Sequence, residues 1–207
     1  PGMVSPHQET RATGRFGIWS VNLMKDSNMY GLANRALKQP VLMRAGPAVW
    51  TEICTVVGFE EEEFDDLQQY PDSITYEIVG AASERLDTPA EELLRDFGRH
   101  WILFTSQSRY GDFYKQADGD LEEFLRQLNG IHEIVAESMP ELLPPNFGVE
   151  VSGSDLIVFY VSDREGLEPM VLGLLEGLME LFDFKGEVSQ IDDSEYGESR
   201  FLISLKG

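Results

Sequence analysis

The chain has 207 residues, of which 42% are hydrophobic and 11% aromatic, enough to bury the core of one sizeable domain. Its 16 lysines and arginines against 37 aspartates and glutamates give a net charge of −21, which disfavours binding to nucleic acid or to an anionic membrane surface. The lone Cys54 excludes an intramolecular disulfide and fits a cytoplasmic location, and no apolar run is long enough to cross a bilayer.

Residues 1–28 differ from the rest of the chain, because they mix Gly, Pro, Ser and polar residues without a period. We interpret them as a leader, a remnant of cloning or an over-long gene start, and expect them to be poorly ordered. No internal repeat or linker divides the remainder. Residues 29–207 are therefore predicted to form one domain.

The first half of this domain is predicted to be helical. Apolar residues recur at helical spacing from residue 32 to residue 41, where Pro40 should kink or split the helix. Thr88 is expected to cap the helix that leads to Trp101, with Pro89 at its first position. Other helices are predicted over 47–57, 72–85 and 121–138.

The second half changes to a period of two. Strands are predicted over 149–151 and 155–162, joined by a turn, and over 187–191 and 201–205. A helix over 167–182 separates the two pairs. The fold class is therefore α+β, with a helical N-terminal subdomain followed by an antiparallel sheet and a packed helix.

His132 is the first residue that suggests chemistry. It lies on the same helical face as Leu125, Leu128 and Val135, so its ring is expected in an apolar environment. One interpretation is a core histidine bonded to a backbone carbonyl. The other is an axial ligand, because neutral imidazole donates a lone pair to haem iron from within an apolar pocket. The sequence has no Cys-x-x-Cys-His arrangement, so such a haem would be held without thioether bonds.

Three polar residues end the second strand of the hairpin. With a period of two, Tyr160, Ser162 and Arg164 point to one face, and together they present a phenol, a hydroxyl and a guanidinium. These donors would suit carboxylates, although an exposed polar strand end is the alternative. A clamp for two propionates and an apolar-face histidine 28 residues upstream of Tyr160 together suit haem.

The pattern Tyr-x-Ser-x-Arg, with the upstream segment Leu-Asn-Gly-Ile-His, resembles the H-NOX family of haem nitric oxide/oxygen binding domains. This family includes the haem domain of the soluble guanylate cyclase beta subunit and stand-alone bacterial sensors. The resemblance covers nearly all of the domain, and its other matching segments are 29–37, 76–86, 94–101, 144–145 and 166–173. It implies an H-NOX fold with haem b between the helical subdomain and the sheet.

The resemblance also implies roles for particular residues. His132 falls at the proximal iron ligand, and Tyr160, Ser162 and Arg164 fall on the propionate clamp. A proline that presses on the haem and distorts it corresponds to Pro145, which is equally suited to stopping a helix.

On the distal side, Met170 falls where oxygen-binding members carry a tyrosine, and Trp101 lies on a neighbouring helix. Both are otherwise ordinary core residues at helical spacing. Oxygen bound to ferrous haem carries partial negative charge, and a hydrogen bond to such a group is worth about 1.5–3 kcal/mol. A thioether offers no such donor, which favours nitric oxide and carbon monoxide over oxygen. The indole N–H of Trp101 is the alternative donor that would restore oxygen binding.

We therefore expect a gas sensor and not an enzyme. The resemblance implies that nitric oxide weakens or breaks the His132–iron bond, that the helix carrying His132 shifts, and that an effector protein in trans reads the change. The effector would be a histidine kinase, a cyclic-nucleotide enzyme or a chemotaxis protein. A haem-free interaction domain of the same fold is the main alternative, against which His132 argues. An enzyme is disfavoured because Ser106, Ser108 and His100 lie in no nucleophile motif.

Overall fold

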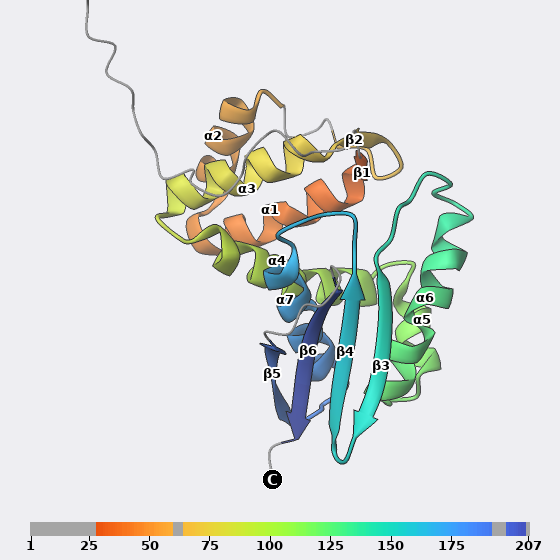
Figure 1. The fold of residues 1–207 in the computed structure, drawn as a ribbon. Coiled ribbons are helices and arrows are strands. Elements are labelled where there is room, and N and C mark those ends of the chain that lie inside the picture. Colours follow the sequence, from red (N-terminus) through yellow and green to blue (C-terminus); the bar gives the residue numbers. More distant parts are fainter. Residues whose placement is uncertain (1–27, 60–63, 192–197, 206–207) are drawn as a thin grey trace, which may run out of the picture.

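The computed structural model describes residues 28–59, 64–191 and 198–205. Figure 1 shows a helical layer above a four-stranded sheet. Its helices are α1 (Gly31–Ala45), α2 (Pro47–Val57), α3 (Asp72–Leu86), α4 (Ala90–Ser106), α5 (Gly111–Gln116), α6 (Leu121–Ala136) and α7 (Glu168–Leu181). Its strands are β1 (Asn28–Tyr30), β2 (Gln69–Pro71), β3 (Asn146–Ser152), β4 (Asp155–Val161), β5 (Gly186–Ile191) and β6 (Glu198–Leu205).

The N-terminal subdomain packs α1, α2 and α3 around one apolar core, whose largest fully buried side chain is that of Trp50. The helix predicted from the apolar repeat of residues 32–41 is confirmed, and α1 runs through Pro40 to Ala45, so of the kink or split expected at Pro40 the split is wrong. Pro40 is itself buried, so packing compensates for the backbone hydrogen bond that proline cannot make. A short antiparallel pair, β1 with β2, was not predicted from the sequence.

The C-terminal sheet has the strand order β3-β4-β6-β5 and is antiparallel throughout. The predicted hairpin is confirmed, because Ser152 pairs with Asp155 across the turn. The side chains of Val158, Phe201 and Ile203 are fully buried in the core between the sheet and α7, which lies behind the sheet in Figure 1. The α+β architecture is thus the one predicted.

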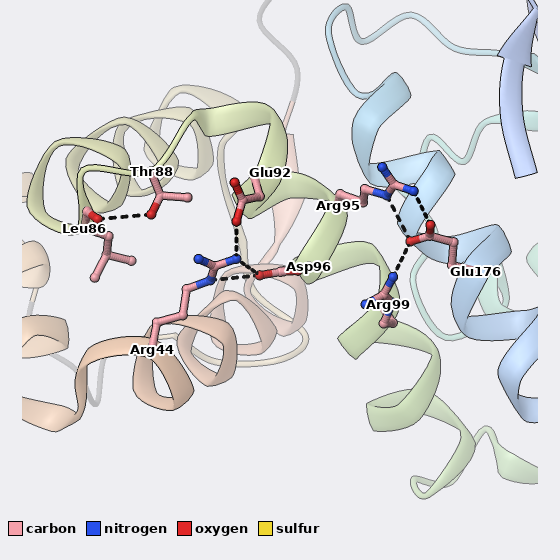
Figure 2. A network of polar contacts seen from close by, with 8 residues as sticks. All are labelled: Arg44, Leu86, Thr88, Glu92, Arg95, Asp96, Arg99 and Glu176. Carbon is pink, nitrogen blue, oxygen red and sulfur yellow. Dashed lines mark hydrogen bonds and ion pairs between the residues drawn. The ribbon is translucent and has the colours of Figure 1, made fainter.

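Helix α4 connects the two parts. A Cβ atom at Gly98 would overlap the Met170 backbone, and one at Gly173 would overlap the Arg95 backbone, so α4 and α7 touch through bare main chain. Figure 2 shows the polar contacts on either side of α4. Arg44 of α1 bonds Asp96, while Arg95 and Arg99 both bond Glu176 of α7. Packing and charge therefore fix α4 against both α1 and α7.

The predicted start of α4 needs correction. The helix begins at Ala90, Pro89 occupies the capping position, and no side chain caps the helix. The Thr88 hydroxyl instead donates to the Leu86 carbonyl oxygen at 3.1 Å, as Figure 2 shows. Thr88 lies one residue before the capping position, and the first-turn N–H groups of Glu92 and Leu93 donate to the Pro89 carbonyl oxygen instead.

The predicted leader lies outside the described residues except for Asn28, which pairs with Pro71 in the small sheet. Among the described residues, no helix is both long and apolar enough to span a membrane.

Candidate functional site

A cavity of about 280 Å³ lies between the two parts of the fold. Its volume is near the lower end of the range for small-molecule sites. Helix α6 forms one wall, α4 and α7 form another, and the β3–β4 hairpin and the β1 segment complete it. All seven candidate residues line this cavity: Trp101, His132, Pro145, Tyr160, Ser162, Arg164 and Met170. The remaining lining is mostly apolar.

Helix α6 positions His132. The helix is capped by Asp120, whose carboxylate accepts a hydrogen bond from the Glu123 backbone N–H at 3.0 Å. Its buried side chains, Leu121, Phe124 and Leu125, all belong to the N-terminal half. The half that carries His132 borders the cavity on one side and is bonded to the start of β3 through Asn129 on another.

The imidazole of His132 is suited to ligation. Its Nδ1 atom is buried and has no hydrogen-bond partner among the described residues. Burial lowers the pKa of His132 below its ordinary value of 6.5, while a backbone interaction with Pro145 acts in the opposite direction. The ring is therefore neutral at physiological pH and has a lone pair available.

The three polar residues reach the cavity, but not as a single strand face. Strand β4 ends at Val161, so Ser162 and Arg164 lie beyond it and the predicted alternation stops at Tyr160. The chain turns there: the Ser162 hydroxyl accepts a hydrogen bond from the Arg164 backbone N–H at 3.1 Å. Burial, the largest influence, raises the pKa of Tyr160, although a hydrogen bond with Ser162 opposes this.

Arg164 has protein partners of its own. Its guanidinium donates to Asp72 Oδ2 at 2.8 Å, to the Leu143 carbonyl oxygen at 2.8 Å and to the Asn28 carbonyl oxygen at 2.9 Å. Asp72 is only 3% exposed, so this ion pair joins α3 to the loop after β4 at low solvent access. The ion pair was not predicted, since nothing in the local sequence links residues 72 and 164.

The wall that α4 and α7 form contains Met170 and Trp101. Met170 lies in the first turn of α7, where the close contact of α4 and α7 brings it next to Gly98. Trp101 packs against Phe97 and Phe104 on α4, with ring centroids 6.0 and 6.3 Å away. Pro145 lies between α6 and β3, immediately before Asn146.

Sequence reasoning missed two polar features of this region. The Thr105 and Tyr114 hydroxyls, which both line the cavity, lie 2.6 Å apart. Asn129 bonds the backbone of Phe147, one helical turn before His132. The Leu-Asn-Gly-Ile-His segment could have drawn attention to Asn129, because i and i+3 share a helical face. The Thr105–Tyr114 pair joins two helices and has no local signature.

These residues fit a flat, apolar cofactor with anionic groups on one edge. A buried imidazole nitrogen without a partner can bind a metal centre. Apolar walls exclude water from such a cofactor, and Arg164 supplies a positive charge beside two hydroxyls.

Comparison with known proteins agrees with this reading. Residues 30–190 match the family model described as Haem-NO-binding (HNOB), so the chain belongs to that family. It is 28% identical over 155 residues to soluble guanylate cyclase gcy-33 of Caenorhabditis elegans, a match that covers 74% of this chain and 16% of that protein. It is 33% identical over 108 residues to the soluble guanylate cyclase beta-2 subunit of Rattus norvegicus, covering 51% and 16% respectively.

Solved structures confirm the H-NOX fold. An H-NOX protein from S. oneidensis in the Fe(II)NO ligation state superposes with a TM-score of 0.74 at 19% identity, covering 86% of this chain and all of that one. An Fe(II) mutant of the S. oneidensis H-NOX protein gives a TM-score of 0.78 at 22% identity, covering 86% and 97%. The chain spans less than a quarter of the length of the curated relatives named above.

Proposed function

We propose that this chain is a haem-based sensor of diatomic gases, with nitric oxide as its main ligand and carbon monoxide as a second one. The observation that carries the proposal is His132, whose buried, unpartnered Nδ1 belongs to a neutral imidazole on the wall of an apolar cavity. When bound, haem b supplies an iron atom with one coordination position open to a gas. Membership of a haem-NO-binding family supports the same reading.

Each lining residue has a proposed role. His132 ligates the iron. Arg164, together with Ser162 and Tyr160, donates hydrogen bonds to the propionates, and Pro145 presses on the macrocycle from the His132 side. For Arg164 this means sharing or exchanging Asp72, the anion to which its guanidinium is bonded.

The wall that α4 and α7 form determines the choice of gas. Met170 offers no hydrogen-bond donor, so it gives no help to a ligand that accumulates negative charge. Nitric oxide and carbon monoxide need much less of this help than oxygen does. Trp101 lines the same cavity, and its indole N–H is the alternative donor that would favour oxygen.

Release of His132 is the proposed signal. Helix α6 packs on β3 and α5, and its C-terminal half borders the cavity, so a change at His132 moves this helix first. We propose that an effector in trans, such as a histidine kinase, a cyclic-nucleotide enzyme or a chemotaxis protein, reads that movement. The chain itself is proposed to bind and signal without catalysing a reaction.

The test is His132→Gly, expressed with and without imidazole. We expect little or no haem without imidazole and recovery of the haem absorption band with it, because free imidazole can occupy the space left by the side chain. His100→Ala is the matched control, since His100 does not line the cavity, and it should retain haem. A His132→Gly protein with an unchanged spectrum and no added imidazole would exclude His132 as the ligand. A colourless wild-type protein would favour the haem-free interaction domain.

A further inference from the structure

A chain of hydrogen bonds crosses the back of the cavity from α5 to α4. The Thr105 hydroxyl lies 2.6 Å from the Tyr114 hydroxyl and 2.7 Å from the carbonyl oxygen of Trp101. A carbonyl only accepts, so the single hydrogen of Thr105 goes to Trp101. Tyr114 must then donate to Thr105. The order is Tyr114 to Thr105 to the Trp101 backbone, with every hydrogen assigned.

The pair is partly shielded from water, Thr105 more than Tyr114. Thr105 is 5% exposed, and burial raises the pKa of Tyr114 despite its bond with Thr105. Loss of the Tyr114 hydroxyl is costly, because the buried Thr105 hydroxyl that is left behind has little solvent to bond. The pair therefore holds α5 on α4 more firmly than an exposed pair would.

Tyr114 extends this connection to α6. Its ring stacks on the Phe124 ring, with the centroids 4.9 Å apart and an angle of 14° between the ring planes. Phe124 is 3% exposed and lies in the anchored half of α6, eight residues before His132. At a rise of about 1.5 Å per residue, those eight residues span about 12 Å. A tilt of α6 at Phe124 is therefore carried directly to the imidazole.

We propose that Tyr114 is a positioning residue for His132: it holds α6 toward the α4 wall, through Phe124 on one side and Thr105 on the other. The inference rests on the proposed function, since it concerns the bond between His132 and iron. Loss of the Tyr114 hydroxyl releases α5 from α4, and α6 then moves outward with its histidine. The expected result is a longer and weaker His132–iron bond.

The experiment compares Tyr114→Phe with Tyr110→Phe. Tyr110 also lines the cavity, but its hydroxyl bonds the exposed Arg109 side chain, so its loss should have no effect. In the ferrous protein, the iron–histidine stretching band in resonance Raman spectra should move to lower frequency in Tyr114→Phe and stay in place in Tyr110→Phe. In the haem-free protein, amide exchange over residues 131–135 should become severalfold faster, within the roughly tenfold that one neutral hydrogen bond is worth.

Substitutions at Thr105 separate positioning from general destabilisation. Thr105→Val removes the acceptor for Tyr114 and should shift the band in the same direction, while Thr105→Ser keeps a hydroxyl and should restore the wild-type value. The double variant Thr105→Val/Tyr114→Phe should shift no further than either single variant, because both remove one bond.

The outcomes also separate this inference from the proposed function. A wild-type protein that takes up no haem would refute the proposed function. The amide-exchange measurement on the haem-free protein would still test whether Tyr114 holds α6 in place. If His132 ligates haem and the band stays in place in both Tyr114→Phe and Thr105→Val, the positioning role is overturned. Equal shifts in Tyr110→Phe and Tyr114→Phe would overturn it as well.

Discussion

Asn129 and Phe147 exchange two hydrogen bonds. The Asn129 side-chain Nδ2 donates to the Phe147 carbonyl oxygen at 2.8 Å, and its Oδ1 accepts from the Phe147 backbone N–H at 3.0 Å. An amide is the side chain that can satisfy both backbone groups of one residue. The bonds fix α6 to the start of β3, three residues from His132 and two residues from Pro145. These two hydrogen bonds therefore set the distance between His132, the proposed ligand, and Pro145.

Asn129→Ala should consequently affect both stability and haem retention. Loss of two partly buried hydrogen bonds is expected to lower the free energy of unfolding by about 1–3 kcal/mol, as measured by urea denaturation of the haem-free protein. Haem transfer to an acceptor protein should be faster. Gln127→Ala is the control on the same helix, because Gln127 bonds only the exposed Glu123. Wild-type values for Asn129→Ala in both assays would mean that the hydrogen bonds between Asn129 and Phe147 are dispensable.

Arg164→Ala should weaken haem retention more than Ser162→Ala does. Arg164 supplies a charge and several donors, whereas Ser162 supplies one neutral group. The two variants should also differ without haem, since Arg164→Ala leaves Asp72 buried without its cation, a loss of about 3–5 kcal/mol for a buried pair. Haem transfer rates and urea denaturation measure the two effects separately. Equal haem loss from both variants would contradict the proposed propionate clamp.

The pH dependence of the haem-free protein should reveal His132. Its folded-state pKa is lowered by burial, so below pH 6.5 the unfolded chain binds the proton more readily than the folded one. The free energy of unfolding is therefore unaffected by His132 above pH 6.5, and it decreases as the pH drops from 6.5 toward the pKa of His132 in the folded protein. His132→Leu should flatten this slope in urea denaturation curves. Some slope should remain, because burial also lowers the pKa of His100. An unchanged slope in His132→Leu would show that the imidazole is not buried in its neutral form.

The ferrous protein should bind nitric oxide and carbon monoxide but form no stable oxygen complex. Met170 places a thioether on the cavity wall that α4 and α7 form, and a missing hydrogen bond to a polarised ligand costs about a hundredfold in affinity. The measurement is an absorption spectrum recorded before and after air is admitted to the reduced protein. Slow conversion to ferric haem, or no change, is the expected result. A stable oxygenated spectrum would instead indicate Trp101 as the donor, and Trp101→Phe should then abolish it.

Local periodicity was sufficient to predict much of the fold. The apolar repeat of residues 72–85 and the alternation on both sides of the turn at 152–154 produced a helix and a hairpin close to the observed ones. Gathering the seven candidate residues required the family pattern, because they come from five separate parts of the chain. What remained hidden depends on contacts between elements: Thr88 turns to a neighbouring carbonyl, Arg164 finds Asp72, and Thr105 finds Tyr114. No window of sequence contains both members of the last two pairs in a recognisable motif.

The bare contact between α4 and α7 makes the two sides of the cavity mechanically unequal. At Gly98 and Gly173 there is no side chain that could change rotamer, so these helices cannot approach further, and Glu176 ties them together with two arginines. The cavity wall that carries Met170 is therefore rigid. Helix α6 is held less closely, since its buried side chains all lie in the half that precedes His132. We therefore expect a change in the contents of the cavity to be expressed mainly in one direction, as an outward displacement of α6.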